Sequence, residues 1–240
     1  MKRLLLTLFM LLTYVGAQSQ ATQVWCENFD GTLSTTSSGT PGWSTDVNYF
    51  TSPANSIKGE YGASGIVTLT SPTFSTLGQN FVLLEFKQIC KIEFSDPGTI
   101  EFSLDGGATW QVFDDNPTKI TTGGSGNCYY QGTGVYFANN NAFSEGSYID
   151  WAPGTTTAPT QTWWKTENFD VSLALANQAN VQIRFKIADV FGGMAGRYGW
   201  LLDDICVTAA PCELVDPTVS APYPGNPLYS GDVYNMGPYD

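Results

Sequence analysis

The sequence predicts an all-β fold, an antiparallel β-sandwich of the jelly-roll type. Apolar and polar residues alternate over 82–87, 100–105 and 181–187, the pattern of strands with one buried and one solvent-facing side. Turn signals such as Ser71-Pro72 separate these segments. Only residues 171–179 have a helical pattern, and that stretch is short enough for a single turn. Short strands divided by turns favour two packed antiparallel sheets.

The two ends of the chain differ from this strand pattern. Residues 1–21 are predicted to be a secretory signal peptide, because a basic start precedes an apolar run from Leu4 to Leu12 that is short for a membrane span. No later stretch is apolar enough to cross a bilayer. Residues 22–212 are expected to form the sandwich domain, and 213–240 a tail or linker rich in Pro, Gly and Tyr. We therefore expect a secreted or cell-surface protein.

The charge balance argues against nucleic acid as a partner. Loss of Lys2 and Arg3 with the signal peptide leaves eight of the ten basic residues against 22 acidic ones, a net charge of −14. Nucleic acids and anionic lipids are bound largely by clusters of Lys and Arg, so neither is expected here. Solubility outside the cell is the simpler explanation of the acidity.

The cysteine count predicts disulfides. Five cysteines in an exported chain indicate paired thiols with one left over. Connectivity cannot be deduced from the sequence spacing alone, and we predict two pairings. These are Cys90 with Cys128, and Cys26 with either Cys206 or Cys212.

One short motif predicts a specific turn. It has the form S-x-D-x-G-x-T-W and consists of Ser103, Asp105, Gly107, Thr109 and Trp110. In such a turn the Asp caps backbone amides, the Gly supplies a positive φ, and the Trp packs on the hairpin. The motif resembles the Asp-box, found repeatedly in sialidase propellers and singly in reelin-type repeats, where it is structural. We therefore expect a structural turn and no chemistry from these residues.

The chain lacks the residues that most enzyme classes need. A sialidase would need several such boxes and three arginines, whereas only Arg184 and Arg197 follow the signal peptide. The absence of histidine excludes Ser-His and Cys-His nucleophile pairs and His-containing zinc sites. A glycosidase needs only two carboxylates, but Glu101 and Asp105 are better explained as solvent-facing strand and turn residues. We therefore expect no enzyme and assign no catalytic residue.

The order of several segments resembles that of a known group of modules. Glu27-Asn28-Phe29-Asp30, Gly42-Trp43, the strand 81–90, the Asp-box hairpin and the closing stretch 200–205 follow one another along the chain. This order is similar to that of reelin repeats, MAM domains and the cleaved adhesin domains of secreted bacterial surface proteins, over roughly residues 24–208. The resemblance implies a concanavalin-like or galactose-binding-like jelly roll. It also implies a mostly non-catalytic role in adhesion or recognition.

We therefore predict a secreted or cell-surface binding or adhesion module for an extracellular glycan or protein ligand. The alternatives are a polysaccharide-active enzyme, an accessory domain of a longer secreted protease or glycosidase, and a structural spacer. For a glycan ligand, exposed aromatics of the segment 114–162 and of the stretch that follows it would stack on sugar faces. The candidates are Tyr129, Tyr130, Tyr136, Tyr148, Trp151, Trp163 and Trp164. Of these we favour Tyr130, Tyr136 and Trp151.

A structural calcium ion is predicted near the end of the domain. Asp203 and Asp204 have apolar neighbours, and a carboxylate in such surroundings is costly unless it is paired or bound to metal. Calcium takes carboxylate and carbonyl oxygens. The first and last strands of a jelly roll usually lie close, so Glu27 and Asp30 are the further candidate ligands. The reelin and MAM resemblance implies the same role for Asp203.

The direction of the side chains follows from strict alternation along this last strand. It places Asp203 on one face, together with Leu201, Ile205 and Val207, and Asp204 on the other. The alternative to calcium is that these acids cap turns or meet Arg184, Arg197 or solvent.

Overall fold

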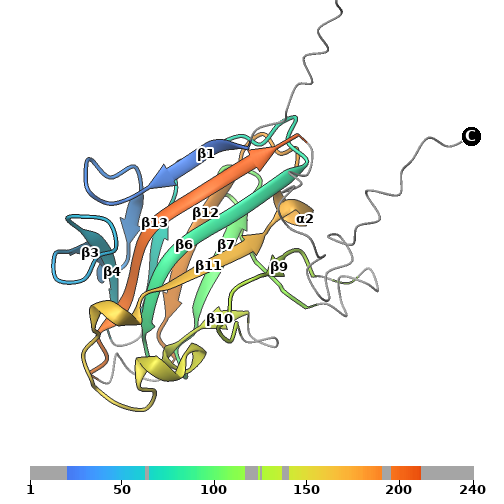
Figure 1. The fold of residues 1–240 in the computed structure, drawn as a ribbon. Coiled ribbons are helices and arrows are strands. Elements are labelled where there is room, and N and C mark those ends of the chain that lie inside the picture. The colour runs from blue at the N-terminus through green and yellow to red at the C-terminus, as the bar shows by residue number, and fades with distance from the viewer. Residues whose placement is uncertain are drawn as a thin grey trace, which may run out of the picture.

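Two antiparallel sheets pack face to face in the computed structural model, and the predicted β-sandwich is confirmed (Figure 1). The structure describes residues 21–62, 65–116, 124, 126–136, 141–190 and 196–211. The predicted tail, Cys212 and all but the last residue of the predicted signal peptide lie outside this range. Within it, no helix is long and apolar enough to span a membrane.

Among the described residues, sheet A has seven strands in the order β3-β4-β13-β6-β11-β9, with β1 paired to β13. Its strands are β1 (Thr22–Glu27), β3 (Pro41–Asp46), β4 (Ser56–Tyr61), β6 (Phe81–Lys91), β9 (Tyr129–Tyr130), β11 (Lys165–Asp170) and β13 (Gly199–Ala210). The first and last strands of the domain are therefore direct neighbours, as predicted.

Sheet B, as far as the structure describes the chain, has six strands in the order β10-β7-β12-β5-β2, with β8 paired to β7. Its strands are β2 (Thr36–Ser38), β5 (Ile66–Thr70), β7 (Gly98–Ser103), β8 (Gln111–Val112), β10 (Ala142–Phe143) and β12 (Gln182–Ala188). Helical structure among the described residues is limited to single turns, namely η1 (Glu145–Ser147), η2 (Ile149–Trp151), η3 (Gln161–Trp163) and α2 (Ser172–Leu175).

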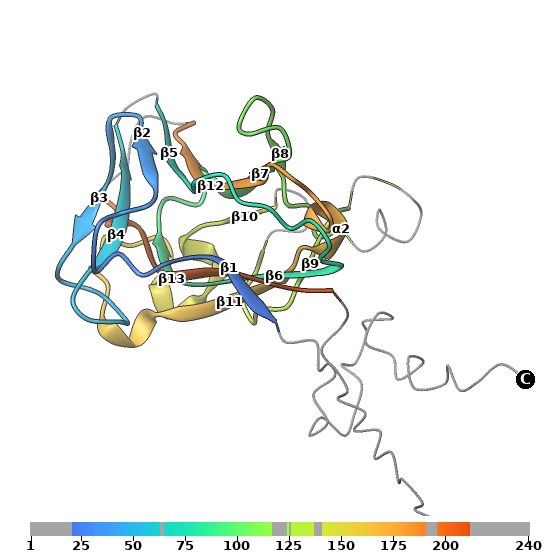
Figure 2. The ribbon, with the colours of Figure 1, turned by 90° about the horizontal axis from the view of Figure 1, so that it is seen from above.

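The core lies between the two sheets, which Figure 2 shows as separate layers. The alternation of β6 places Leu84 and Phe86 in this core, both with no exposed surface. The Phe86 ring meets Phe169 of β11 and, edge-on at 5.1 Å between centroids, Phe185 of β12. Burial of large aromatic rings from both layers supplies most of the apolar area that stabilises such a sandwich.

A β-bulge in β13 overturns part of the prediction for this strand. Asp203 lies opposite Lys87, whereas Cys206 lies opposite Glu85, so β13 has one more residue than β6 over this stretch. The extra residue is Asp204, which adopts a left-handed φ of 47°. Because the bulge resets the alternation, Asp203 faces the outer side of sheet A. The predicted placement of Asp203 on the same face as Ile205 and Val207 is therefore wrong.

Candidate functional site

The outer face of sheet A carries a shallow groove of about 580 Å³. The groove lies over β1, β13, β6 and β11, which run side by side in Figure 1. Its polar lining residues are Gln23, Glu27, Asn28, Glu85, Lys87, Asn168, Asp204 and Thr208. The groove therefore offers amide, carboxylate, ammonium and hydroxyl groups on one surface.

Strand register explains how residues far apart in sequence meet in this groove. Asn168 lies opposite Glu85, Glu85 opposite Cys206, and Cys206 opposite Cys26, so one row crosses four strands. Side chains on one face repeat every second residue, so neighbouring rows are about 6.6 Å apart. The groove floor is thus built on paired backbone, which holds the side chains in fixed relative positions.

Lys87 and Asp204 form the ion pair of the groove. The Lys87 ammonium lies 2.9 Å from Asp204 Oδ2. Burial alone would raise the pKa of Asp204, but hydrogen bonds from Lys87, Ser52 and Thr51 outweigh it, and the pKa lies below its ordinary value. Asp204 is therefore ionised near neutral pH. With Glu85 also in the lining, the acids of the groove outnumber its base.

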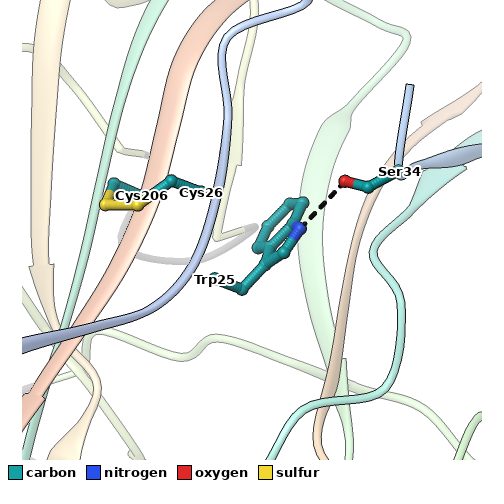
Figure 3. Close-up of a disulfide and its surroundings, with 4 residues drawn as sticks. All are labelled: Trp25, Cys26, Ser34 and Cys206. Atoms are coloured by element: carbon teal, nitrogen blue, oxygen red, sulfur yellow. Dashed lines mark hydrogen bonds between the residues drawn. A yellow bond between two sulfur atoms is a disulfide. The ribbon is translucent and has the colours of Figure 1, made fainter. Parts of the chain in front are cut away.

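A disulfide between Cys26 and Cys206 joins β1 to β13 beside the groove (Figure 3). The two cysteines lie directly opposite each other in the ladder, and Cys26 is exposed. The neighbouring Trp25 donates its indole N–H to the Ser34 hydroxyl at 3.1 Å. Of the two partners predicted for Cys26, Cys206 and Cys212, the structure pairs it with Cys206.

The guessed pairing of Cys90 with Cys128 is wrong, since both are buried free thiols. Tyr129, which follows Cys128, lies opposite Asp170, and Asp170 lies opposite Leu83. Leu83 and Cys90 are seven residues apart on the same strand, or roughly 23 Å at the usual rise. A disulfide needs Cα atoms within about 7 Å, so Cys90 and Cys128 lie too far apart to form one.

The four acids predicted to bind calcium are held in separate groups. Glu27 accepts hydrogen bonds from the backbone and hydroxyl of Ser34, both at 2.6 Å, and Asp30 accepts from the backbone N–H of Asn55 at 2.9 Å. Asp203 and Asp204, in contrast, lie together. Within the described ranges, no three acidic, cysteine or histidine side chains form a group suited to a metal ion.

Asp203 and Asp204 share one hydroxyl. Thr51 Oγ1 lies 2.9 Å from Asp203 Oδ2 and 3.0 Å from Asp204 Oδ2. Asp203 has no exposed surface and also accepts the backbone N–H groups of Thr51 and Ser52, at 2.6 and 3.1 Å. Burial raises the pKa of Asp203 despite these hydrogen bonds. The pair therefore places two carboxylates beside the single ammonium of Lys87.

Two of the three favoured sugar-stacking aromatics are packed inside the protein, and the third, Tyr130, is half-buried. Trp151 is 0% and Tyr136 is 6% exposed, so neither has a face free for a ligand, and the prediction for these two is wrong. The Tyr130 ring packs against Phe143 and Phe169, with centroids 5.8 and 4.9 Å away. Loop composition indicated aromatic content here, but it did not indicate on which side of the loop the rings lie.

Tyr130 instead belongs to a partly buried polar cluster that the sequence did not suggest. Its hydroxyl donates to Glu167 at 2.5 Å, and the same carboxylate accepts from Tyr148 and from the Gln88 amide, both at 2.9 Å. Burial raises the pKa of Glu167. Glu167 lies opposite Phe86 in the ladder, so it faces the core and not the groove.

The S-x-D-x-G-x-T-W segment forms a hydrogen-bonded turn between β7 and β8. Asp105 accepts from the backbone and hydroxyl of Thr109 at 2.9 and 2.6 Å, and Ser103 accepts from the Gly107 N–H at 2.8 Å. Hydrogen bonds from Thr109 and Ser103 lower the pKa of Asp105 to about 2. The Trp110 indole donates to the Gly107 carbonyl at 3.0 Å. These contacts account for the turn without a ligand.

Glu101 differs from its predicted place on a solvent-facing strand surface. It lies on the outer face of sheet B, yet it is only 3% exposed. Arg184 and Lys186 of the neighbouring strand both form ion pairs with its carboxylate. The two long side chains cover the acid, which the alternation pattern could not indicate.

The comparisons with known proteins give structural likeness only. No family model and no curated protein matches the chain. A solved structure described as a carbohydrate-binding module of the β-sandwich superfamily is similar at 12% identity and a TM-score of 0.40, with 75% of this chain and 59% of that one covered. The chain thus spans less than two thirds of the length of that protein.

Two further solved structures are similar at the same low level. A xylan-binding domain from Paenibacillus barcinonensis has 11% identity and a TM-score of 0.38, with coverage of 80% of this chain and 97% of that one. The enzymatically active domain of a tailspike protein from bacteriophage CBA120 has 10% identity and a TM-score of 0.33, with coverage of 80% and 19%. Scores this low carry no argument about function, so the functional argument rests on the chain itself.

Proposed function

We propose that this chain is an extracellular carbohydrate-binding module and that the groove on sheet A binds a neutral oligosaccharide. The observation that carries the proposal is the mixture of hydrogen-bonding groups along the groove, with side chains such as Gln23, Asn168 and Thr208. Sugar hydroxyls both donate and accept hydrogen bonds, and amide and hydroxyl side chains can likewise do both. Leu83, 41% exposed, adds an apolar contact for the carbon face of a sugar ring.

The charge of the groove favours a neutral ligand over an acidic one. Glu85 and Asp204 outnumber Lys87, and Lys87 is already paired to Asp204. An acidic sugar chain placed here meets like charge, which lowers its affinity relative to a neutral chain.

Binding is favoured over hydrolysis by the state of the acids. Glycosidases need one carboxyl that stays protonated, through a raised pKa, beside a second that is ionised. In the groove, the pKa of Asp204 is lowered, the wrong direction for a general acid. The pKa values of Asp203 and Glu167 are raised, but Asp203 has no exposed surface, and Glu167 is buried and faces the core. We therefore propose recognition without bond cleavage.

The test is a glycan array of neutral xylan, β-glucan and mannan oligosaccharides, followed by calorimetry on the best ligand. We expect Gln23→Ala and Asn168→Ala each to weaken binding roughly three- to tenfold, the range of one net hydrogen bond. Thr166→Ala is the matched control, because Thr166 lies on the same face of β11, two residues from Asn168, and outside the groove. Equal affinity of all variants contradicts the proposal, and release of reducing sugar supports the enzyme alternative.

We further propose a structural calcium ion at the Asp203–Asp204 pair. The support is the charge balance there, two adjacent carboxylates against Lys87, since calcium would offset the remaining charge with oxygen ligands that include backbone carbonyls. We expect calcium to raise the melting temperature over that in chelator, by an amount equivalent to about 2.7 kcal/mol at 100 times the dissociation constant. Asp203→Asn should remove this difference and Glu85→Gln should keep it. Identical melting of the wild type in both solutions contradicts the calcium site.

A further inference from the structure

We propose that the outer face of sheet B holds a second site, which binds the anionic groups of an acidic polysaccharide through Arg184 and Lys186. This site is separate from the groove on sheet A. It binds an anionic ligand, whereas the groove favours a neutral one. Figure 2 shows the two sheets as distinct layers, so the two outer faces point in opposite directions.

Register places the two cations at the centre of this face. Thr36 lies opposite Thr70, Thr70 opposite Arg184, and Arg184 opposite Glu101, so one row crosses four strands. Two residues along the strands, a parallel row consists of Ser38, Thr68, Lys186 and Thr99. Each row therefore runs from exposed hydroxyls on β2 to a cation on β12.

The cluster carries a surplus of positive charge. Arg184 and Lys186 share the one carboxylate of Glu101, and both cation side chains are 22% exposed while Glu101 is almost covered. In a chain with a formal net charge of −12, such a surplus is unusual. Surface acids elsewhere repel an anionic ligand, so this local surplus directs it to one place.

The two cations keep donors for a ligand. A guanidinium has five N–H donors and an ammonium three. Within the described part of the chain, Glu101 is the sole side chain that accepts from either Arg184 or Lys186. The remaining donors are therefore available to a carboxylate or sulfate oxygen, in charge-assisted hydrogen bonds.

A buried hydroxyl beside Lys186 supports the same site. Thr99 lies opposite Lys186 and is 7% exposed, and its Oγ1 has no hydrogen-bond partner among the described residues. An unsatisfied buried polar group costs free energy. An oxygen of an arriving ligand that contacts Lys186 would relieve this cost.

The turn motif gains a role from this arrangement. The guanidinium of Arg184 lies over the Trp110 ring, with Cζ 4.1 Å from the ring centroid. The ring is fixed in turn by its hydrogen bond to Gly107. Stacking on a fixed ring holds Arg184 in one orientation. The side chain therefore loses less conformational entropy when a ligand binds. Trp110 is therefore a positioning residue for the anion site.

Hydroxyl-bearing strands beside the cations favour a polysaccharide as the carrier of the anion. Thr36 and Ser38 are exposed and Thr68 and Thr70 half-buried, so hydrogen-bonding groups extend from the cations to the edge strand β2. A long chain of linked sugars can contact the cations and these hydroxyls together. Nucleic acid is disfavoured because two cations are far fewer than a phosphate backbone needs.

The experiment compares polygalacturonate with its fully methyl-esterified form, which has the same sugar chain without the charge. We expect the full mature chain to bind polygalacturonate at least tenfold more tightly, with the difference reduced as ionic strength rises. Dextran sulfate separates a sulfate preference from a carboxylate preference. Binding to either anion, if lost in Arg184→Gln, supports the site, and binding to neither overturns it.

Two substitutions with opposite expected signs separate a binding role from a structural one. Arg184→Gln should weaken polygalacturonate binding at least tenfold. Glu101→Gln should strengthen it, because both cations then lose their competing carboxylate. Lys165→Gln is the matched control, since Lys165 is equally exposed and paired to Asp150 but lies on sheet A. If Glu101→Gln weakens binding in a protein that still melts cooperatively, the proposal is overturned.

The positioning role of Trp110 has its own readout. Trp110→Ala should weaken polygalacturonate binding severalfold, and Trp110→Phe should restore most of it because the ring face remains. Equal loss in both variants at unchanged melting temperature contradicts the stacking role. Neutral-sugar binding in the groove should be unchanged in every sheet B variant, so failure of one site is distinguishable from failure of the other.

Discussion

Removal of the Cys26–Cys206 disulfide is expected to lower the free energy of unfolding by about 2–5 kcal/mol. The bond joins residues 180 positions apart, and in the chain-entropy model a closed loop of this length contributes about 5 kcal/mol. Strand β1 pairs with β13 alone among the described strands, so the bond also fixes an edge strand. The measurement is denaturant unfolding of Cys26→Ser/Cys206→Ser against the oxidised wild type.

The double variant also provides the control for chemical reduction. A reductant should lower the stability of the wild type to that of the double variant and leave the double variant unchanged. Because Gln23 and Asn28 reach the groove from β1 and the residue after it, sugar affinity should fall with the same treatment. A double variant as stable as the wild type contradicts the contribution of the bond.

The predictable part of the fold is the part in which side-chain alternation is unbroken. Strand β12 keeps alternate burial over its whole length, with Ile183, Phe185 and Ile187 in the core, as the sequence predicts. Strand β13 does not, because a bulge at Asp204 inserts one residue. A bulge depends on the partner strand and on the hydrogen bonds offered to its side chains, here by Thr51 and Lys87. None of these is near Asp204 in sequence.

The candidate site was less predictable than the fold for a related reason. Each groove residue, such as Gln23 or Asn168, is an ordinary polar residue on the outer face of its own strand. Only the order of the strands in the sheet brings such residues from four strands onto one surface. The prediction for the aromatic loop residues failed for the opposite reason. Tyr136 and Trp151 are residue types that often bind ligands, but here both pack within the hydrophobic core.

The second large effect is expected at a buried ion cluster beneath η1 and η2. Lys91 has no exposed surface, and its ammonium lies 2.8 Å from both Glu145 Oε2 and the Ala152 carbonyl. Arg197 donates to the same carboxylate through Nε at 2.8 Å and Nη2 at 3.0 Å, and the Gly154 N–H donates at 2.9 Å. These hydrogen bonds outweigh the effect of burial and lower the pKa of Glu145. The cluster holds η1 and the residues after η2 against the outer face of β6.

Glu145→Gln is therefore expected to lower the free energy of unfolding by about 3–5 kcal/mol, because it leaves the Lys91 ammonium buried without an anion. Lys91→Met should cost less, since Glu145 keeps Arg197 and the Gly154 N–H. The double variant should be more stable than Glu145→Gln alone, because the buried cation is then gone as well. Such a recovery is the sign of direct coupling in a double-mutant cycle.

The half-buried pair Lys58–Glu60, which water still reaches, provides the matched control for this cycle. Its side chains are 19% and 35% exposed, and an ion pair in that position contributes about 0–1 kcal/mol because water already solvates both charges. Lys58→Met and Glu60→Gln should therefore each change the unfolding free energy little, with no measurable coupling. If Glu145→Gln costs no more than Glu60→Gln, the buried cluster does not hold the helical turns in place. Additive costs for Lys91→Met and Glu145→Gln would likewise exclude a direct interaction between the two charges.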